Sequence, residues 1–134
     1  CCFNNKHLQP LGETRDRQKI FPLHTQINTE TEAFLHDSAK SIAGNPSQKM
    51  WPHYTNQSNE FHTGIWQADI GKWEVSYSED EYCFILEGKN VVTNADGETI
   101  TVQAGDHFVI PAGFAGTWEV IEPTRKVYVI YERA

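Results

Sequence analysis

Two glycine-punctuated stretches, residues 73–88 and 105–120, constrain the fold more than any other feature of this sequence. Each contains short runs of aromatic and β-branched residues that end at glycine or another turn-forming residue, as β-strands do. The first stretch ends in the spacing Glu-x6-Gly at Glu81 and Gly88, and the second begins with Gly-x5-Pro-x-Gly at Gly105. The C-terminal half of the chain is therefore predicted to consist of strands joined by tight turns.

Strand-like runs recur at even intervals from Phe61 onward. They are predicted at 61–68, 72–78, 81–88, 90–94, 98–103, 107–110, 115–121 and 125–132. The Asp96-Gly97 pair predicts a tight hairpin between 89–93 and 99–103, because glycine tolerates the positive φ that such turns require. Many short strands separated by turns, with little helix, indicate an all-β sandwich or barrel.

The N-terminal part of the chain lacks this rhythm. Residues 1–24 show no sustained hydrophobic period and are predicted to form a loose arm. Residues 29–40 begin with cap-like residues and place apolar side chains on one broad side, which predicts one short helix. Residues 44–59 are rich in Asn, Pro, Gln and Ser and are predicted to form a loop, anchored on the core by Trp51 and Tyr54.

The composition limits the classes of partner. With 134 residues and 39% apolar content the chain is expected to form one domain, and its net charge of −7 argues against nucleic acids and anionic membranes as partners. No apolar run reaches the roughly 18 residues of a membrane span. Cysteines at positions 1, 2 and 83 show no disulfide or zinc spacing, so we expect a reducing, cytoplasmic location.

The two glycine-punctuated stretches resemble the two signature motifs of the cupin superfamily, over about the C-terminal half of the chain. Typical cupins carry three histidines in these motifs, which bind a metal together with the glutamate. Aligned on the shared residues, the two histidine positions of the first motif fall on Val75 and Tyr77. The histidine and asparagine positions of the second motif fall on Gly116 and Val120. Of the four usual ligands, only Glu81 is present.

In more detail, residues 80–88 and 110–128 are similar to a branch of small single-domain cupins. This branch is related to ethanolamine-utilisation cupins and, more distantly, to ureidoglycine aminohydrolase cupins. The resemblance implies an RmlC-like jelly-roll barrel of antiparallel strands over residues 25–134, with a pocket between its sheets. It also implies a homodimer, for which the exposed edge strands of a small barrel give a physical motive.

No cofactor is expected, because a divalent transition metal needs three or four converging donors and the motifs supply one carboxylate. A metal site with a non-standard ligand set is the alternative. Such a site would recruit Glu79, His62 or His107, although each of these histidines is more typical of a strand end or a surface.

The alternation of side chains along strands predicts what lines the pocket. If Glu81 points inward, Cys83 does as well. The same alternation places Trp73 and Tyr77 on one face of their strand and Trp118 on the corresponding face of a later strand. The predicted lining is Trp73, Tyr77, Glu81, Cys83 and Trp118. This aromatic box with one acid suits a small ligand with a flat or cationic part. The alternative is that the inward aromatic residues are ordinary core.

Three functions fit these residues. The first is a metal-independent enzyme on a small polar or cationic metabolite, with Glu81 as acid or base at a raised pKa and Tyr77 assisting. The second is a non-catalytic module that binds a small-molecule ligand, and the third is a metal enzyme with unusual ligands. Cys83 is expected to be a small buried side chain rather than a nucleophile. Arg125 and Lys126 are expected to form a surface salt link near Glu122.

Overall fold

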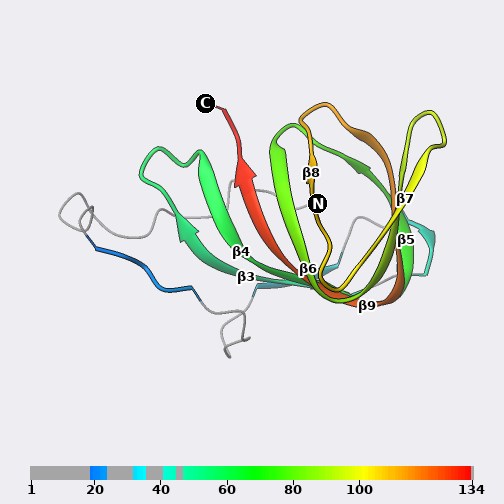
Figure 1. Cartoon of the computed structure of the whole chain (residues 1–134), viewed down its shortest axis with the longest axis horizontal. Coiled ribbons are helices and arrows are strands. Elements are labelled where there is room, and N and C mark those ends of the chain that lie inside the picture. Colours follow the sequence, from blue (N-terminus) through cyan, green and yellow to red (C-terminus); the bar gives the residue numbers. More distant parts are fainter. Residues whose placement is uncertain (1–18, 24–31, 36–40, 45–46, 134) are drawn as a thin grey trace.

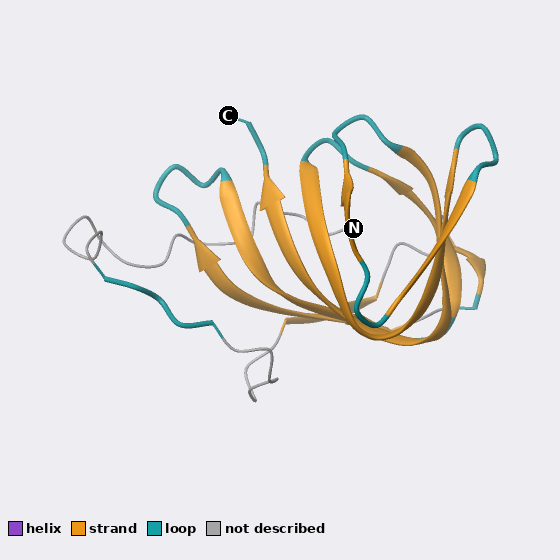
Figure 2. Ribbon diagram, in the orientation of Figure 1, coloured by secondary structure: helices purple, strands orange, loops and turns teal. Residues whose placement is uncertain are grey.

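The computed structural model describes residues 19–23, 32–35, 41–44 and 47–133 of the chain. Every regular element in these ranges is a β-strand (Figure 2). The strands are β1 Glu32–Leu35, β2 Ser41–Ala43, β3 Ser47–Thr55, β4 Phe61–Ala68, β5 Gly71–Ser76, β6 Asp80–Asn94, β7 Thr99–Gln103, β8 His107–Ile110 and β9 Ala115–Tyr131. None of these described residues forms a helix that could span a membrane. The predicted all-β fold class is confirmed.

The nine strands of the described residues form one antiparallel sheet. Its main path runs β1-β3-β4-β9-β5-β2, while β6 pairs with β7, β8 and β9. The long strands β6 and β9 span the molecule and curl with it. The first half of β9 pairs with β5 and its second half with β4, while the first half of β6 pairs with β8 and its second half with β7 (Figure 1). The curl turns one face of the sheet inward.

The strands predicted at 81–88 and 90–94 form the single strand β6, and those predicted at 115–121 and 125–132 form β9, with a bend in place of each expected turn. The pairing of the two strands shifts register three times between Ile85 and Asn90 but does not end. Gly88 has a φ of +89°, and a Cβ there would collide with the carbonyl oxygen of Pro123. The predicted strand pairs on either side of the turns are therefore the two arms of β6 and of β9.

The hairpin predicted at Asp96-Gly97 is confirmed. β6 and β7 pair from Lys89 with Gln103 to Thr93 with Thr99. The side-chain Oδ1 of Asn94 accepts hydrogen bonds from the backbone N–H groups of residues 96 and 98, at 3.0 and 2.9 Å. These two hydrogen bonds satisfy backbone N–H groups of the turn and fix the register of the two strands.

Two predictions for the N-terminal part are wrong. Residues 32–35, inside the predicted helix, form strand β1, which pairs with β3 from Glu32 with Met50 to Leu35 with Ser47. The rest of the predicted helix lies outside the described residues. The predicted loop at 44–59 contains β3, which is hydrogen-bonded to β1 on one side and β4 on the other. Backbone pairing along the sheet edge outweighs the local preferences of both segments.

The sequence of β3 hides its strand character. Pro52 lies at a register shift of the β3–β4 pairing, and bulges are among the few places where sheets accept proline. The predicted anchor Trp51 is buried, and Tyr54 packs against Phe21 with ring centroids 5.2 Å apart. Of the arm predicted at 1–24, residues 19–23 are described and have no regular structure, and the remainder lies outside the described residues.

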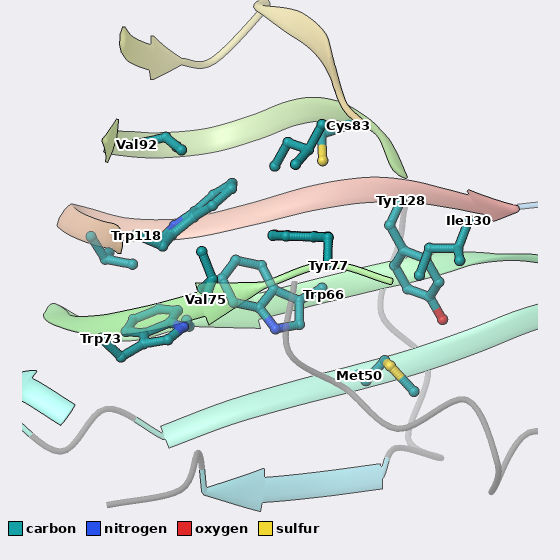
Figure 3. Packing of buried hydrophobic residues seen from close by; sticks show 13 residues of the cluster. Met50, Trp66, Trp73, Val75, Tyr77, Cys83, Val92, Trp118, Tyr128 and Ile130 are labelled. Carbon is teal, nitrogen blue, oxygen red and sulfur yellow. The ribbon is translucent and has the colours of Figure 1, made fainter. Parts of the chain in front are cut away.

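The alternation of side chains places an apolar cluster on the inward face of the sheet. In β5 the buried positions are Gly71, Trp73 and Val75, and the positions between them are more exposed. The cluster contains Met50, Trp66, Ala68, Trp73, Val75, Tyr77, Cys83, Val92, Ile110, Trp118, Val120, Tyr128 and Ile130. Figure 3 shows the labelled members converging between the strands. The interior is thus rich in indole and phenol rings.

The bend yields a prediction for Gly88→Ala. The added Cβ combines a positive φ with a collision against backbone atoms of the facing strand, so we expect the free energy of unfolding to fall by about 2–4 kcal/mol. The matched control is Gly97→Ala, which has a φ of +85° but no atom near the added Cβ, and which is expected to cost about 1–2 kcal/mol. Urea unfolding of both variants measures the difference. Equal losses would show that the close approach to Pro123 is unimportant.

Candidate functional site

A buried ion pair lies at the centre of the inward face. Lys126 Nζ on β9 is 2.8 Å from Glu81 Oε2 on β6, and neither side chain has any solvent-exposed surface. The register of β6 and β9 pairs Glu81 with Ile130 and Ile85 with Lys126, so the two long charged side chains reach each other from positions four residues apart along the ladder. Burial of two charges is costly unless they neutralise each other with good hydrogen-bond geometry. The short distance meets this requirement.

The thiol of Cys83 completes a small polar cluster with the ion pair. It donates a hydrogen bond to Glu81 Oε2 at 3.3 Å, and Lys126 Nζ donates to the sulfur at 3.4 Å. Burial, together with the negative charge of Glu81, raises the pKa of the Cys83 thiol to about 12. The cysteine is therefore a neutral thiol at physiological pH rather than a nucleophile, as its position in a strand predicts.

Two indole rings enclose the ammonium of Lys126. Its Nζ lies 4.4 Å from the ring centroid of Trp118 and 4.7 Å from that of Trp66. The Trp118 ring is fixed by a hydrogen bond from Nε1 to Asn90 Oδ1 at 3.1 Å, and the Trp66 ring by one from Nε1 to Gln48 Oε1 at 3.0 Å. The rings meet nearly at a right angle, with an interplanar angle of 78°. Both indoles thus present a face to the cation.

The charge state of Glu81 differs from the prediction. Burial alone raises the pKa of this carboxyl, but the positive charge and hydrogen bond of Lys126, aided by Cys83, hold the pKa below its ordinary value. The expectation of a raised pKa is wrong because the sequence did not reveal the cation beside the carboxyl. Glu81 is an ionised carboxylate at neutral pH.

Tyr77 and Trp73 are also buried and belong to the apolar cluster of the inward face. The hydroxyl of Tyr77 makes no hydrogen bond among the described residues. The Tyr77 ring packs edge-on against Phe114, at 6.0 Å between centroids. Trp73 packs against Trp66 at 6.2 Å. Of the five predicted lining residues, the structure brings Glu81, Cys83 and Trp118 into one cluster and leaves Tyr77 and Trp73 around it.

The model of the EutQ-like cupin domain family matches residues 55–128, which is more than half of the 134-residue chain.

The chain belongs to this cupin family. The curl of the sheet and its antiparallel pairing agree with the jelly-roll barrel that the resemblance implied. No curated protein sequence matches the chain.

Solved structures show the same fold. A protein of unknown function from Pseudomonas syringae pv. tomato superposes with a TM-score of 0.73 at 18% identity, over 81% of this chain and 46% of that chain. The present cupin thus spans about half the length of that relative. The putative ethanolamine utilization protein Q of Salmonella typhimurium gives a TM-score of 0.57 at 24% identity, over 68% and 72% of the two chains. The EutQ protein of Clostridium difficile gives 0.58 at 18% identity, over 64% and 63%.

The side chains around Glu81 do not fit the divalent metal that the cupin fold commonly carries. The ammonium of Lys126 is in contact with the one carboxylate of the usual ligand set, and a second cation there would be repelled. His62 is engaged with Thr55 Oγ1 at 3.0 Å and the Asn59 carbonyl at 3.1 Å. His107 lies beside Tyr82. The described residues contain no group of three or more His, Cys, Asp or Glu side chains that could hold a metal ion.

Sequence reasoning missed Lys126 and Trp66. Lys126 was expected on the surface with Arg125, but only Arg125 forms an outward salt link, to Glu87 Oε1 at 3.0 Å. The parity of β9 carries the missing signal, because residues 124, 126, 128 and 130 are all buried. Neighbouring valines made both faces of this strand look apolar, so the parity was ambiguous. In β4, residues 62–66 are all buried, so an alternation of burial does not single out Trp66.

The ion pair yields a prediction for Lys126→Met. An apolar side chain at this position leaves the Glu81 carboxylate buried and without its cation, so we expect a loss of about 3–5 kcal/mol in the free energy of unfolding. The double variant Lys126→Met with Glu81→Leu removes both charges and is expected to recover most of that loss. Urea unfolding of the two single variants and the double variant gives the coupling energy. Simple addition of the single losses would contradict a direct coupling.

The pKa shifts predict opposite pH dependences for two neighbouring carboxyls. Because the pKa of Glu81 is lowered on folding, its stabilising contribution is complete above the ordinary value of 4.5 and is lost as the pH falls through its lower folded pKa. Burial raises the pKa of Glu79 despite a hydrogen bond from Ser78, so its contribution is present below 4.5 and is lost as the pH rises through its higher folded pKa.

The free energies of unfolding of the wild type, Glu81→Gln and Glu79→Gln, measured between pH 3 and pH 7, test these two predicted pH dependences. Relative to the wild type, Glu81→Gln should be most destabilised at pH 7 and least at pH 3. The Glu79→Gln variant should gain stability relative to the wild type as the pH rises. Parallel curves for the two variants would refute the assignment of the shifts.

Proposed function

We propose that this cupin domain binds a small polar metabolite inside its barrel, beside the Glu81–Lys126 pair and without a transition metal. The observation that supports this proposal is the complete burial of a hydrogen-bonded ion pair among aromatic rings. Replacement of a buried ion pair by apolar side chains of similar volume is often neutral or stabilising, so stability alone does not account for such a pair. Buried charges with shifted pKa values are instead concentrated at functional sites.

The roles of the surrounding residues follow from their chemistry. Lys126 and Glu81 supply a donor and an acceptor of fixed orientation, and the Cys83 thiol supplies a weak donor. The indole of Trp118 forms one apolar wall. The indole of Trp73, which packs against Trp66, forms another. A mostly apolar wall with a few oriented polar groups is the usual composition of a small-molecule site.

Tyr77 is the residue that we propose contacts the ligand directly. Its hydroxyl is buried and has no hydrogen-bond partner among the described residues, which is unfavourable unless a ligand or water supplies one. Its backbone is held firmly, since its N–H donates to the Phe114 carbonyl at 2.9 Å and its carbonyl accepts from Gly113 at 2.7 Å. The hydroxyl therefore belongs to a loop residue whose backbone is held in place by two hydrogen bonds.

A metal-independent enzyme is the second candidate. The direct contact between Lys126 Nζ and Glu81 Oε2 provides a path along which a proton can move between the two groups. Glu81 would then act as a general base, with Lys126 returning the proton and Tyr77 orienting the substrate. The lowered pKa of Glu81 makes it a weak base, and this favours binding over catalysis as the primary proposal.

The indole N–H signals of the four tryptophans give a direct test of binding. Small neutral polar compounds, carboxylic acids and amines are titrated into the protein, and shifts of the Trp66 and Trp118 signals identify a ligand. With that ligand, Tyr77→Phe is expected to weaken binding by about 3–10-fold through loss of one hydrogen bond. The same variant should not lower the melting temperature, because the hydroxyl has no partner in the protein.

The matched control is Tyr131→Phe, which removes the hydroxyl of a half-exposed tyrosine at the end of β9. It should leave both the affinity and the melting temperature unchanged. If no compound shifts the two indole signals, binding inside the barrel is excluded for these classes. If Tyr77→Phe instead lowers the melting temperature and leaves the affinity unchanged, Tyr77 is structural.

A further inference from the structure

Three groups surround the ammonium of Lys126 in the arrangement by which proteins recognise ammonium ligands. The faces of Trp66 and Trp118 lie 4.7 and 4.4 Å from Nζ, and the Glu81 carboxylate lies 2.8 Å away. Two aromatic faces and one carboxylate form a binding cage for an alkylammonium ion. We propose that these three residues, the cation cage, are a cation-binding site that the chain fills with its own Lys126.

The walls of the cation cage are positioned independently of Lys126. Hydrogen bonds to Asn90 and Gln48 hold the two indoles, and both amide side chains are fully buried. Asn90 Nδ2 in turn donates to Thr124 Oγ1 at 2.9 Å, and Thr124 Oγ1 donates to the Glu87 carbonyl at 2.9 Å. These contacts come from β3, β6 and β9 and do not involve the ammonium. The cage should therefore persist when the lysine side chain is shortened.

Occupation of the cage by Lys126 determines which ligands the barrel accepts. A free amine or a divalent cation would have to displace a lysine that already satisfies the carboxylate and both ring faces. The ligand is therefore a neutral or anionic polar molecule. This statement about the ligand rests on the proposed function, whereas the occupation of the cage does not. The cationic ligands that the sequence analysis allowed are therefore excluded from the interior, because Lys126 occupies the cage.

Removal of the lysine should convert the cage into an open site for amines. Lys126→Ala lacks three methylenes and the ammonium, and n-propylammonium has the same atoms. We expect this amine to raise the melting temperature of Lys126→Ala by several degrees, increasing with its concentration, and to leave the wild type unchanged. The neutral analogue 1-propanol should have little effect, because it lacks the charge that Glu81 requires.

A matched variant isolates the role of the carboxylate. Lys126→Ala combined with Glu81→Gln keeps the cavity and both indoles but removes the negative charge, and its response to n-propylammonium should be at least tenfold weaker. An equal response of the two variants, or an equal effect of 1-propanol, would show that the cavity is merely filled. A folded Lys126→Ala that does not respond to the amine would refute the cage.

The wild type provides a test that needs no destabilised variant. The ammonium of Lys126 should give a slowly exchanging ¹⁵N–¹H signal at neutral pH, and its Hε protons should be shifted upfield by the two indole rings. The conservative variant Lys126→Arg, which removes this signal, assigns it. Absence of a protected, ring-shifted lysine signal would overturn the proposal. This measurement is independent of any ligand, so it separates failure of the cage from failure of the proposed binding function.

Discussion

The contact between Glu81 and Lys126 is the interaction on which the interior of this cupin depends. Either charge alone would be buried among aromatic rings without compensation, at a cost of several kcal/mol. Together they allow Cys83 and two indoles to pack around a neutral pair. The lowered pKa of Glu81 is a direct consequence of this contact, and both indole faces and the Cys83 thiol lie against it.

The contact in turn depends on the curl of the sheet. Glu81 lies near the start of β6 and Lys126 in the C-terminal half of β9, on the same side of the bend that contains Gly88. On the other side, the same two strands carry Asn90 and Trp118 into the interior. The bend therefore brings the carboxylate, the cation and the clamped indole onto one concave face. A glycine is needed there because the facing strand passes too closely for a side chain.

Some features of this fold are encoded in local sequence, whereas others depend on the pairing of segments far apart in the chain. The inward orientation of Glu81, Cys83 and Trp118 follows from strand parity and was predicted, as were the hairpin and the fold class. The partner of Glu81 was not predicted, because it depends on the register between two strands far apart in sequence. β3 was missed for a related reason, since its polar composition resembles a loop and its strand structure depends on pairing with β1 and β4.

Two features of the interior lower the stability of the fold, and apolar side chains at the same positions would avoid this cost. A phenylalanine at position 77 would fill the same volume without a buried hydroxyl that lacks a partner in the described protein. An apolar pair at positions 81 and 126 would remove the desolvation of two charges. Departures from favourable packing are expected where a site needs oriented polar groups. Both departures lie on the same concave face, and this coincidence favours a ligand-binding interior over a purely structural core.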